Sequence, residues 1–548
     1  MELTGLLTAV LILLSCCYFI YSTWKTMYRK RGLPPGPTPL PLIGNLLNIK
    51  MGSMANSFVK LSEQYGSVYT LYFGLNPIIV ICGYEAVKEA LIDQNDDFGA
   101  RGKLPTISQF TKGYGLSLAN GERWKKMRTF TFKTLKDFGL GKKSNEWKIQ
   151  EEAQCVVEEF RKSQGKPHPG GEHGMWQPGG GCGMWQSGGG GGHPLNPSAM
   201  FMDAFSNILC SILFGDRYDY TDRRFKKLLF ITEEIFRLTS STWGQVQTIL
   251  PTLMSYIPGP HHKAVSFSEE MVEFVAEIVK SCQQTLDLSK PKHFVDCFLI
   301  KIEKEKDDPN TEFTMKNLLY TIHNLFVAAT ETLSISLQHT LLSLLVYPEI
   351  EAFHRCWTGK LSDRFVHLYW GDCCAEFKDK LHEEIDRVIG RDRMVNMEDK
   401  FNMPYTQAVI HEVQRFCDIV PFNVPHMVTK DTMFRGYHIP KGTDVYTLLC
   451  IVHRDSTQFS TPYKFNPNHF LDENGQFKKN EAFMAFSVGK RSCPGEGVAR
   501  MELFIFLTTI LQNFKLTSQI KFSEADVAPK LKGFLNVPIK YELSFIPR

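Results

Sequence analysis

The chain has 548 residues, of which 43% are hydrophobic and 12% aromatic, enough to bury a large core. Its formal net charge of +4 is too small for a nucleic-acid-binding footprint, and no basic stripe interleaved with aromatic residues stands out. The 14 cysteines lie at irregular spacings without a CxxC pair, which excludes a disulfide-stapled secreted scaffold in a chain this long.

The first predicted element is an uncharged apolar stretch at residues 3–21, about the length needed to cross a bilayer. Only Glu2 precedes it, whereas a basic cluster follows it at Lys25, Arg29, Lys30 and Arg31. The positive-inside rule therefore predicts that the rest of the chain is cytosolic. A cleaved signal peptide is the alternative, but it requires a basic start that this segment lacks. We expect residues 1–24 to form a transmembrane anchor.

A basic and proline-rich segment at residues 25–45 follows the anchor. The five prolines between Leu33 and Asn45 disfavour helix and favour a stiff, extended backbone. We interpret this segment as a linker that sets the tilt of the body against the membrane.

The body itself is predicted to be mainly helical with small β-sheets. Alternating runs at residues 67–74 and 77–83 predict a hairpin, and residues 537–546 predict a strand at the end of the chain. Apolar residues spaced three and four apart predict helices that include residues 156–160, 225–238, 269–282 and 314–347.

Two segments do not fit a packed body. Residues 165–194 are glycine-rich and repeat the tetrapeptide GMWQ, a composition typical of a flexible loop. Residues 353–377 interrupt a plain join between two helices. Both contain metal-binding residue types, but a flexible backbone and adjacent cysteines make poor chelators. These residues are His168, His173, Cys182 and His193 in the first segment and Cys356, Cys373 and Cys374 in the second.

One cysteine lies in a distinctive setting, the stretch FSVGKRSCPGEG at residues 486–497. Cys493 comes just before a helix, whose N-terminus stabilises a thiolate by partial positive charge and free N–H groups. Arg491 offers a fork for a carboxylate. Three glycines allow a tight backbone around the sulfur, Gly489, Gly495 and Gly497. The helix is predicted to have an apolar stripe at Leu503, Leu507, Ile510, Leu511 and Phe514.

This stretch closely resembles the signature F-x-x-G-x-R-x-C-x-G of the cytochrome P450 family, whose haem iron takes a cysteine thiolate ligand. The resemblance implies that Cys493 binds the iron of haem b and that Phe486, Gly489 and Arg491 belong to the haem site. It extends from the anchor to Arg548 apart from the two atypical segments. It therefore implies the cytochrome P450 fold, with a single haem-binding domain at residues 46–548.

Three further stretches resemble the vertebrate microsomal branch of the family, called family two. They are residues 34–45, 403–416 and 439–442. The overall sequence resembles fish members of this branch, and the subfamily is left open.

The resemblance assigns further roles. The family's E-x-x-R motif is matched by Glu412 and Arg415, which share one helix face and can join an ion-pair network. His469 stands where many members have arginine. The stretch at residues 324–334 supplies Glu331 and Thr332 for proton delivery. Taken alone, Glu331 would be a surface charge and Thr332 a hydroxyl bonded to the fourth carbonyl before it.

The same stretch has two departures from the family pattern. Ala329 replaces the usual glycine beside Ala328, and Leu333 replaces a usual hydroxyl residue, which alters the expected chain of waters. Elsewhere the resemblance implies a haem-propionate set of Arg101, Trp124, Arg128, His426 and Arg491. The residues that it implies for the substrate pocket are Phe110, Asn324, Ala328, Phe422 and Phe534.

Four other basic residues are expected to dock an acidic electron donor, since complementary charge speeds encounter. A solvated face is the alternative for these residues, which are Arg123, Lys125, Lys126 and Lys490.

The resemblance thus implies a haem-thiolate monooxygenase in the endoplasmic reticulum membrane. It would insert one oxygen atom of O2 into a lipophilic substrate such as a fatty acid, steroid or xenobiotic. Electrons would come from NADPH through NADPH–cytochrome reductase, with cytochrome b5 as an optional second donor. Two alternatives stay open: a reductase-independent haem-thiolate isomerase or dehydratase, and an inactive relic disturbed by the two atypical segments.

Overall fold

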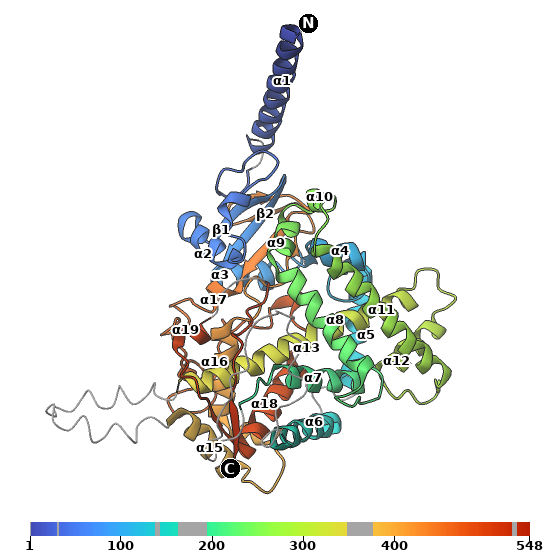
Figure 1. The fold of residues 1–548 in the computed structure, drawn as a ribbon, viewed down its shortest axis with the longest axis vertical. Helices are drawn as coiled ribbons and strands as arrows, with labels where there is room; N and C mark the ends of the chain where they lie inside the picture. Colours follow the sequence, from blue (N-terminus) through green and yellow to red (C-terminus); the bar gives the residue numbers. More distant parts are fainter. Residues whose placement is uncertain (1, 30–31, 138–142, 163–193, 348–375, 529–533) are drawn as a thin grey trace, which may run out of the picture.

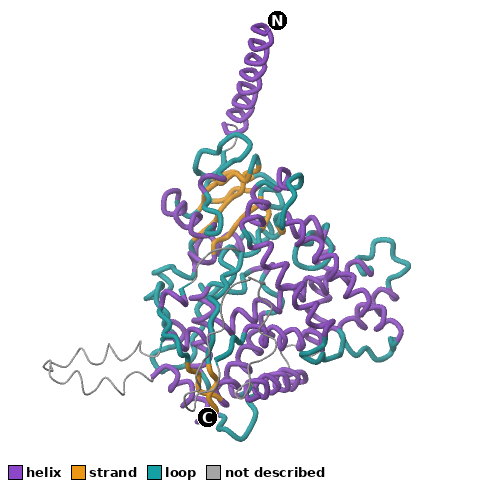
Figure 2. The backbone as a smooth tube through the Cα atoms, viewed as in Figure 1, coloured by secondary structure: helices purple, strands orange, loops and turns teal. Residues whose placement is uncertain are grey.

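The computed structural model describes residues 2–29, 32–137, 143–162, 194–347, 376–528 and 534–548 (Figure 1). Almost all of the two atypical segments, residues 165–194 and 353–377, therefore lies outside the described residues. The metal-binding residue types noted in these segments lie outside them as well. In the rest of the chain the helices dominate and the strands form small sheets, as predicted (Figure 2).

The N-terminal helix α1, Glu2–Arg29, projects away from the body (Figure 1). Its apolar side chains between Leu6 and Tyr21 are exposed, and Trp24 Nε1 donates to the carbonyl of Pro39 at 2.8 Å. In the part of the chain that the structure describes, we find no helix with both the length and the apolar character of a membrane span. The transmembrane anchor thus stays a prediction.

The proline-rich segment is docked on the body. Thr70 N donates to Pro35 O at 2.9 Å, and Tyr72 N donates to Asn45 Oδ1 at 2.8 Å. A Cβ on Gly36 would come within 2.0 Å of the Thr70 carbonyl oxygen, so only glycine allows this close approach. The segment is therefore fixed against the first strand of the sheet, and its Pro39 also accepts the hydrogen bond from Trp24 of α1.

The main sheet has the strand order β1-β2-β7-β4-β3. Its strands β1 and β2 form the predicted antiparallel hairpin, whereas β2 and β7 pair in parallel across a wide sequence separation. The short pair β3–β4 sets Arg101 opposite His426. The strands of this sheet are β1 Val68–Phe73, β2 Asn76–Cys82, β3 Ala100–Arg101, β4 His426–Met427 and β7 Asp444–Leu448.

Two further sheets have two strands each. They pair β5 Thr432–Phe434 with β6 Tyr437–Ile439, and β8 Phe514–Thr517 with β9 Ser544–Pro547. The strand predicted at residues 537–546 is thus shorter and begins later than its sequence pattern indicates.

All four predicted helices form. The ranges 156–160, 225–238, 269–282 and 314–347 correspond to α6, α8, α11 and α13. The helix α13, Met315–Val346, has 32 residues and crosses the middle of the molecule (Figure 1). The Thr314 hydroxyl caps its N-terminus by accepting from Asn317 N at 3.2 Å.

The other helices surround α13 and the sheets. They are α2 Met54–Tyr65, α3 Tyr84–Lys88, α4 Pro105–Thr111, α5 Gly121–Asp137, α6 Lys143–Lys162, α7 Ser198–Leu213, α8 Arg223–Ser240, α9 Thr242–Ile249, α10 Pro251–Met254, α11 His261–Gln284, α12 Phe294–Lys304, α15 Glu376–Val388, α16 Pro404–Cys417, α17 Leu449–Val452, α18 Glu496–Asn513 and α19 Glu524–Val527.

The helix after Cys493 corrects one expectation. The sequence pattern indicates a one-sided apolar stripe, but every residue from Met501 to Gln512 in α18 is buried. The reason is that α18 packs against α6, α13, α15 and α16 at once, and a helix buried on all sides needs no polar face. Phe514, placed in the stripe by the sequence, is the first residue of β8.

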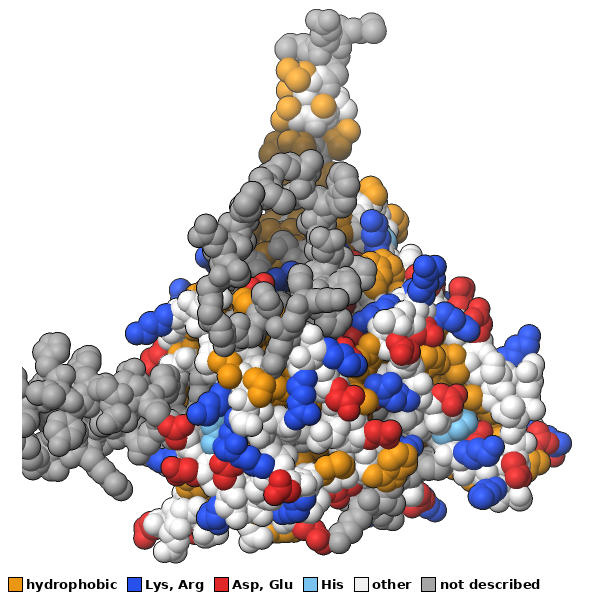
Figure 3. Space-filling model, turned by 60° about the horizontal axis from the view of Figure 1, so that its bottom comes forward, with side chains coloured by type: hydrophobic (Ala, Val, Ile, Leu, Met, Phe, Trp, Pro, Cys, Tyr) orange, Lys and Arg blue, Asp and Glu red, His pale blue; other side chains and the backbone are white. Residues whose placement is uncertain are grey.

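The surface mixes both signs of charge. On the face seen in Figure 3, Lys and Arg side chains alternate with Asp and Glu side chains across the body. This distribution agrees with the small net charge of the sequence.

Candidate active site

A cavity of about 480 Å³ lies between α13 and the segment that carries Cys493. It collects most of the residues that the sequence singled out, from segments far apart in the chain. The predicted residues that line it are Arg101, Trp124, Arg128, Asn324, Ala328, Thr332, Phe486, Arg491, Cys493 and Phe534.

The loop before Cys493 is held in a tight conformation. Gly489 has φ +72°, and a Cβ there would come within 1.9 Å of the Leu91 carbonyl oxygen. Ser487 also has a positive φ of 58°, and the Cys493 N–H donates to the Phe486 carbonyl at 2.8 Å. These contacts close the loop on itself and set the sulfur at the cavity, just before α18 begins at Glu496.

The protonation of Cys493 departs from the simplest expectation. Cys493 is exposed where it borders the cavity, yet burial of the thiol by the surrounding protein, followed by the Glu496 charge, raises its pKa above the ordinary value. The N–H groups of Gly495 and Glu496 and the Arg128 cation act in the opposite direction. Burial outweighs them, so the helix N-terminus alone does not make this sulfur an anion. A metal cation deprotonates a coordinating thiol, and the site therefore suits a cysteine that becomes a thiolate on binding one.

Three arginines face the same cavity. Arg101 donates to the carbonyls of Val424 and Arg491 at 2.9 and 3.1 Å. Arg491 donates to the carbonyl of Gly99 at 2.8 Å. Arg128 donates to the carbonyl of Ser492 at 2.8 Å. These bonds to neutral carbonyls position the guanidinium groups but do not neutralise their charge.

Two nitrogens of these arginines, Arg101 Nε and Arg491 Nη1, are buried without a hydrogen-bond partner. Burial, together with repulsion from Arg128, lowers the pKa of Arg101 to about 9. Burial and repulsion from Arg101 and Arg128 lower the pKa of Arg491 to about 8. Buried cations with free donors require anionic partners. The two carboxylates of a haem fit this requirement.

The side chains around the arginines hold them in place. The Arg491 guanidinium carbon lies 3.7 Å from the centroid of the Trp124 ring, a cation–π contact. His426 Nε2 lies 2.9 Å from Arg101 Nη1, and its Nδ1 lies 2.8 Å from the Phe98 carbonyl oxygen. Since arginine only donates, Nε2 accepts and Nδ1 donates. His426 therefore positions Arg101 and has no free nitrogen for a carboxylate.

Sequence reasoning missed Asn120. Its Oδ1 accepts from Arg101 N at 2.7 Å and from Arg491 Nη2 at 2.8 Å, and its Nδ2 donates to the Arg101 carbonyl at 3.0 Å. This one amide joins two arginines that are far apart in the sequence. The sequence feature that could have indicated this role is the position of Asn120 directly before α5, the helix that carries Trp124 and Arg128.

The opposite wall of the cavity is α13. Its small residues Ala328 and Ala329 line the cavity and leave space in it. Thr332 also lines the cavity, and its hydroxyl donates to the Ala328 carbonyl at 2.8 Å. This is the bond to the fourth carbonyl before Thr332 that was given in Sequence analysis as the alternative to proton delivery. Glu331 does not line the cavity, and burial followed by repulsion from Glu233 raises its pKa to about 7.

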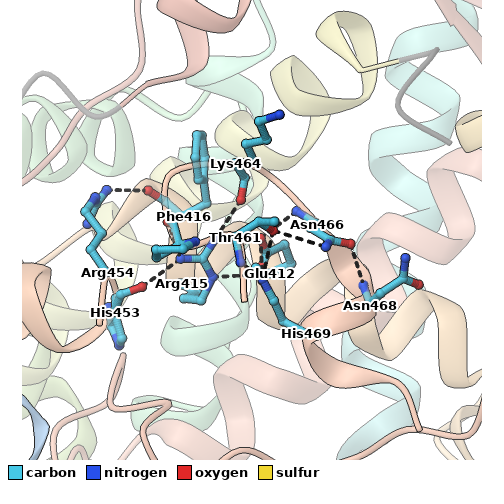
Figure 4. Close-up of polar contacts among 11 residues, drawn as sticks. Glu412, Arg415, Phe416, His453, Arg454, Thr461, Lys464, Asn466, Asn468 and His469 are labelled. Carbon is cyan, nitrogen blue, oxygen red and sulfur yellow. Dashed lines mark hydrogen bonds and ion pairs between the residues drawn. The ribbon is translucent and has the colours of Figure 1, made fainter. Parts of the chain in front are cut away.

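Glu412 and Arg415 form a buried ion pair on α16 (Figure 4). Two parallel hydrogen bonds of 2.7 Å join them, and Arg415 also donates to the carbonyls of His453, Pro462 and Lys464 at 2.7, 2.8 and 2.9 Å. These contacts tie α16 to the chain that leads toward Cys493. The pair thus has the structural role that the resemblance implies.

His469 completes this network. Its Nδ1 lies 3.2 Å from Glu412 Oε2, while its Nε2 accepts from Thr461 N at 3.2 Å. Nδ1 therefore carries the proton and donates to Glu412. A neutral imidazole in this way occupies the place where many family members have arginine.

The predicted substrate residues divide into two groups. Asn324, Ala328 and Phe534 line the cavity, but the Asn324 Oδ1 already accepts from Leu116 N and Ser117 N at 2.9 and 3.0 Å. Phe110 and Phe422 are not on its wall. The Phe110 ring packs against Tyr320 and His323 at centroid distances of 5.0 and 4.8 Å, and Phe422 packs against Phe58 at 5.3 Å.

The four basic residues expected at a docking face all have local partners. Arg123 pairs with Glu312 at 2.6 Å, and Lys125 pairs with Glu122 at 2.7 Å. Lys126 donates to the Asn310 carbonyl at 3.2 Å, and Lys490 pairs with Asp96. The side chains of Lys125 and Lys490 are 63% and 46% exposed, so their charges still reach solvent.

A cysteine loop, two arginines with unpartnered nitrogens and a third arginine around one cavity fit an iron porphyrin with carboxylate side chains. Comparison with known proteins agrees. The family model "Cytochrome P450" matches residues 34–355 and 375–545. The chain belongs to the cytochrome P450 family, and its relatives make it a haem monooxygenase. The gap in the match, residues 356–374, lies within the second atypical segment.

Similar proteins belong to family two, as the resemblance implied. Cytochrome P450 2G1 of Rattus norvegicus is 44% identical over 548 residues, with 100% of each chain covered. Cytochrome P450 2C8 of Homo sapiens is 44% identical over 538 residues, covering 98% of this chain and 99% of that protein. Cytochrome P450 2A6 of Homo sapiens is 42% identical over 545 residues, covering 100% and 99%.

Proposed function

We propose that this chain is a membrane-anchored monooxygenase that oxidises a lipophilic substrate, such as a fatty acid, steroid or xenobiotic, with electrons from NADPH delivered by NADPH–cytochrome reductase. The observation that carries the proposal is the cavity shared by the Cys493 sulfur and the incompletely paired nitrogens of Arg101 and Arg491. Its largely apolar lining supports a lipophilic substrate.

The proposed haem site uses Cys493 as the iron ligand and Arg101, Arg128 and Arg491 as partners of the carboxylates. Haem ligated by a thiolate supplies dioxygen activation, because the thiolate favours O–O cleavage. The chain's own part is to hold this group, to exclude water with the apolar wall and to position the substrate beside Ala328 and Ala329.

Proton supply is proposed to involve Glu331 and Thr332. With a pKa raised to about 7, the Glu331 carboxyl is partly protonated near neutral pH and can both give and take a proton. The Thr332 hydroxyl keeps its lone pairs free to accept while it donates to Ala328 O. Glu331 would therefore be the proton reservoir, and Thr332 Oγ1 would hold and pass on a proton at the cavity wall.

The proposed location is the endoplasmic reticulum membrane, with residues 1–24 as a single-pass anchor and the body in the cytosol. Support comes from the exposed apolar side chains of α1 and from the basic residues that follow it. The exposed charges of Lys125 and Lys490 support docking of an acidic electron donor, the reductase or cytochrome b5.

Two alternative functions are a reductase-independent haem-thiolate isomerase and an inactive relic, and only the second has an observation in its favour. The gap of residues 356–374 in the family match favours an inactive relic.

One experiment separates the three functions. Full-length protein is purified with haem and reductase, its ferrous–CO spectrum is recorded, and NADPH consumption is measured with and without lipophilic compounds. A monooxygenase gives the spectrum of a thiolate-ligated haem and substrate-dependent NADPH consumption. An isomerase gives the spectrum without NADPH consumption, and a relic gives neither unless residues 356–374 are deleted.

A further inference from the structure

His323 lies on α13 directly before Asn324 and is one of the residues that line the cavity. Its side chain is buried, with the residue 3% exposed. The Phe110 ring of α4 packs against it at a centroid distance of 4.8 Å. This residue was not singled out in the sequence analysis. The only feature of the sequence that could have indicated it is its polar side chain on the part of α13 that lines the cavity.

Neither ring nitrogen of His323 has a hydrogen-bond partner. Other buried histidines of the described chain are bonded through at least one nitrogen. His453, for example, lies 3.1 Å from Asp418 through Nδ1 and accepts from Met484 N at 3.1 Å through Nε2. His339 Nε2 lies 3.1 Å from the Asn536 carbonyl oxygen. Among the described residues, His323 alone has both ring nitrogens buried and unbonded.

This arrangement is costly for the ligand-free protein. A buried polar group without a partner destabilises the folded protein, because it has given up its hydrogen bonds to water. Burial also lowers the pKa of His323 to about 3, so the ring is neutral at physiological pH and offers one donor and one acceptor. Since His323 lines the cavity, a ligand there can supply the missing partner once the ring turns toward it.

The neighbouring Asn324 can still donate through Nδ2 but has no free acceptor. Asn324 Oδ1 is occupied by two backbone N–H groups of the segment Leu116–Ser117. The His323 ring can present a nitrogen to the cavity by turning about its Cβ–Cγ bond, a torsion with broad minima. His323 is thus the polar group of this wall with unused hydrogen-bonding capacity on both sides.

We propose that His323 is a specificity-determining residue, which hydrogen-bonds an uncharged carbonyl or hydroxyl oxygen of the lipophilic substrate. This inference rests on the proposed function and names the class of substrate. A carboxylate is disfavoured at this position, because a neutral imidazole does not offset the cost of burying a charge. The selected class is therefore lipophilic ketones and alcohols in preference to free fatty acids anchored by their carboxylate.

The test measures ligand affinity of the haem-bound, full-length protein with two matched pairs of probes. These are 5α-androstan-3-one with 5α-androstane, and 4-phenylcyclohexanone with phenylcyclohexane. Dissociation constants come from the spectral change on displacement of the iron-bound water. The variants are His323→Leu, which removes the hydrogen bond, and His323→Gln, which keeps one. Val327→Ala, on the same cavity wall, is the control for altered shape.

We expect the wild-type protein to bind at least one ketone tenfold or more tightly than its hydrocarbon. His323→Leu should abolish this preference, His323→Gln should restore most of it, and Val327→Ala should change both members of a pair alike. The melting temperature of ligand-free His323→Leu should equal or exceed that of the wild type, because an unbonded polar group is removed.

Several results would overturn the inference. A wild-type protein without ketone preference contradicts it, as does a preference that survives in His323→Leu. A lower melting temperature of His323→Leu together with equal losses for ketone and hydrocarbon would assign a structural role instead. Failure of the proposed function itself is distinguishable, because it would appear as the absence of a thiolate-type ferrous–CO spectrum in the wild type.

Discussion

At position 489 the backbone admits only glycine, for two independent reasons. Its φ of +72° is one that L-residues with side chains rarely adopt, and a Cβ would meet the Leu91 carbonyl oxygen at 1.9 Å. Neither the Cβ nor the carbonyl oxygen can yield easily, because both are fixed to the backbone. The conformation of the loop before Cys493 therefore depends on this single residue.

We predict that Gly489→Ala prevents stable haem uptake and lowers the yield of folded, haem-bound protein at least tenfold. The matched control is Gly497→Ala, because a Cβ at that position would have no neighbour within 4 Å and the residue lies in the first turn of α18. The control should take up haem as the wild type does. Haem content per polypeptide, from absorbance, checks both, and normal haem content in Gly489→Ala would refute the prediction.

Glu502 has an unusual environment for a carboxyl group. It is buried in α18 on the cavity wall, its Oε2 has no hydrogen-bond partner, and burial raises its pKa to about 8. The unfolded chain ionises near the ordinary value of about 4.3. Between these two pKa values the unfolded state releases a proton that the folded state keeps, so Glu502 lowers stability as the pH rises.

For Glu502→Gln we therefore predict a stability gain that depends on pH. The melting temperature of the variant should match that of the wild type near pH 4 and exceed it by a growing margin up to about pH 8. Above about pH 8 the difference in melting temperature should stay constant. Thermal unfolding of both proteins at several pH values measures this difference. A lead that is the same at every pH would show that the Glu502 carboxyl does not titrate in this range.

At the scale of elements, α16 is joined to the segment at residues 453–469 by the Glu412–Arg415 pair. Both side chains are fully buried, and Arg415 uses its planar fork for the carboxylate and its remaining N–H groups for three carbonyls. A lysine would offer a single point charge with no such fork. Replacing the arginine would therefore leave the buried Glu412 carboxylate and the three carbonyls without most of their hydrogen bonds.

Arg415→Met, which removes the charge altogether, should accordingly destabilise the protein by roughly 3–5 kcal/mol, the usual cost of breaking a buried ion pair. Chemical denaturation of the haem-bound protein measures the change. The control is Lys125→Ala, which breaks the exposed pair with Glu122 and should cost less than about 1 kcal/mol. Similar costs for the two variants would contradict the structural role of Arg415.

Local patterns predicted many of these elements. The hairpin β1–β2 and the long helix α13 follow from periodicity within single segments, and both formed as expected. The parallel pairing of β2 with β7 did not follow, because periodicity does not reveal which distant strand is the partner. The all-round burial of α18 was missed for the same reason, since it depends on four packing helices.

At the scale of the whole molecule, the site depends on segments separated by hundreds of residues. Periodicity and composition did not join Arg101, Arg128 and Arg491; the resemblance to a known family did, and the structure gathers them around one cavity. Three features were visible only in space: the bridging role of Asn120, the engagement of His426 with Arg101, and the unbonded ring of His323.

The proposed function of the protein depends on the Cys493 sulfur being the iron ligand. The most direct measurement is the ferrous–CO spectrum of the purified wild-type protein beside that of Cys493→His. We predict a thiolate-type spectrum for the wild type, and for the variant either no haem or the spectrum of an imidazole-ligated haem. An unchanged thiolate-type spectrum in Cys493→His would contradict the account.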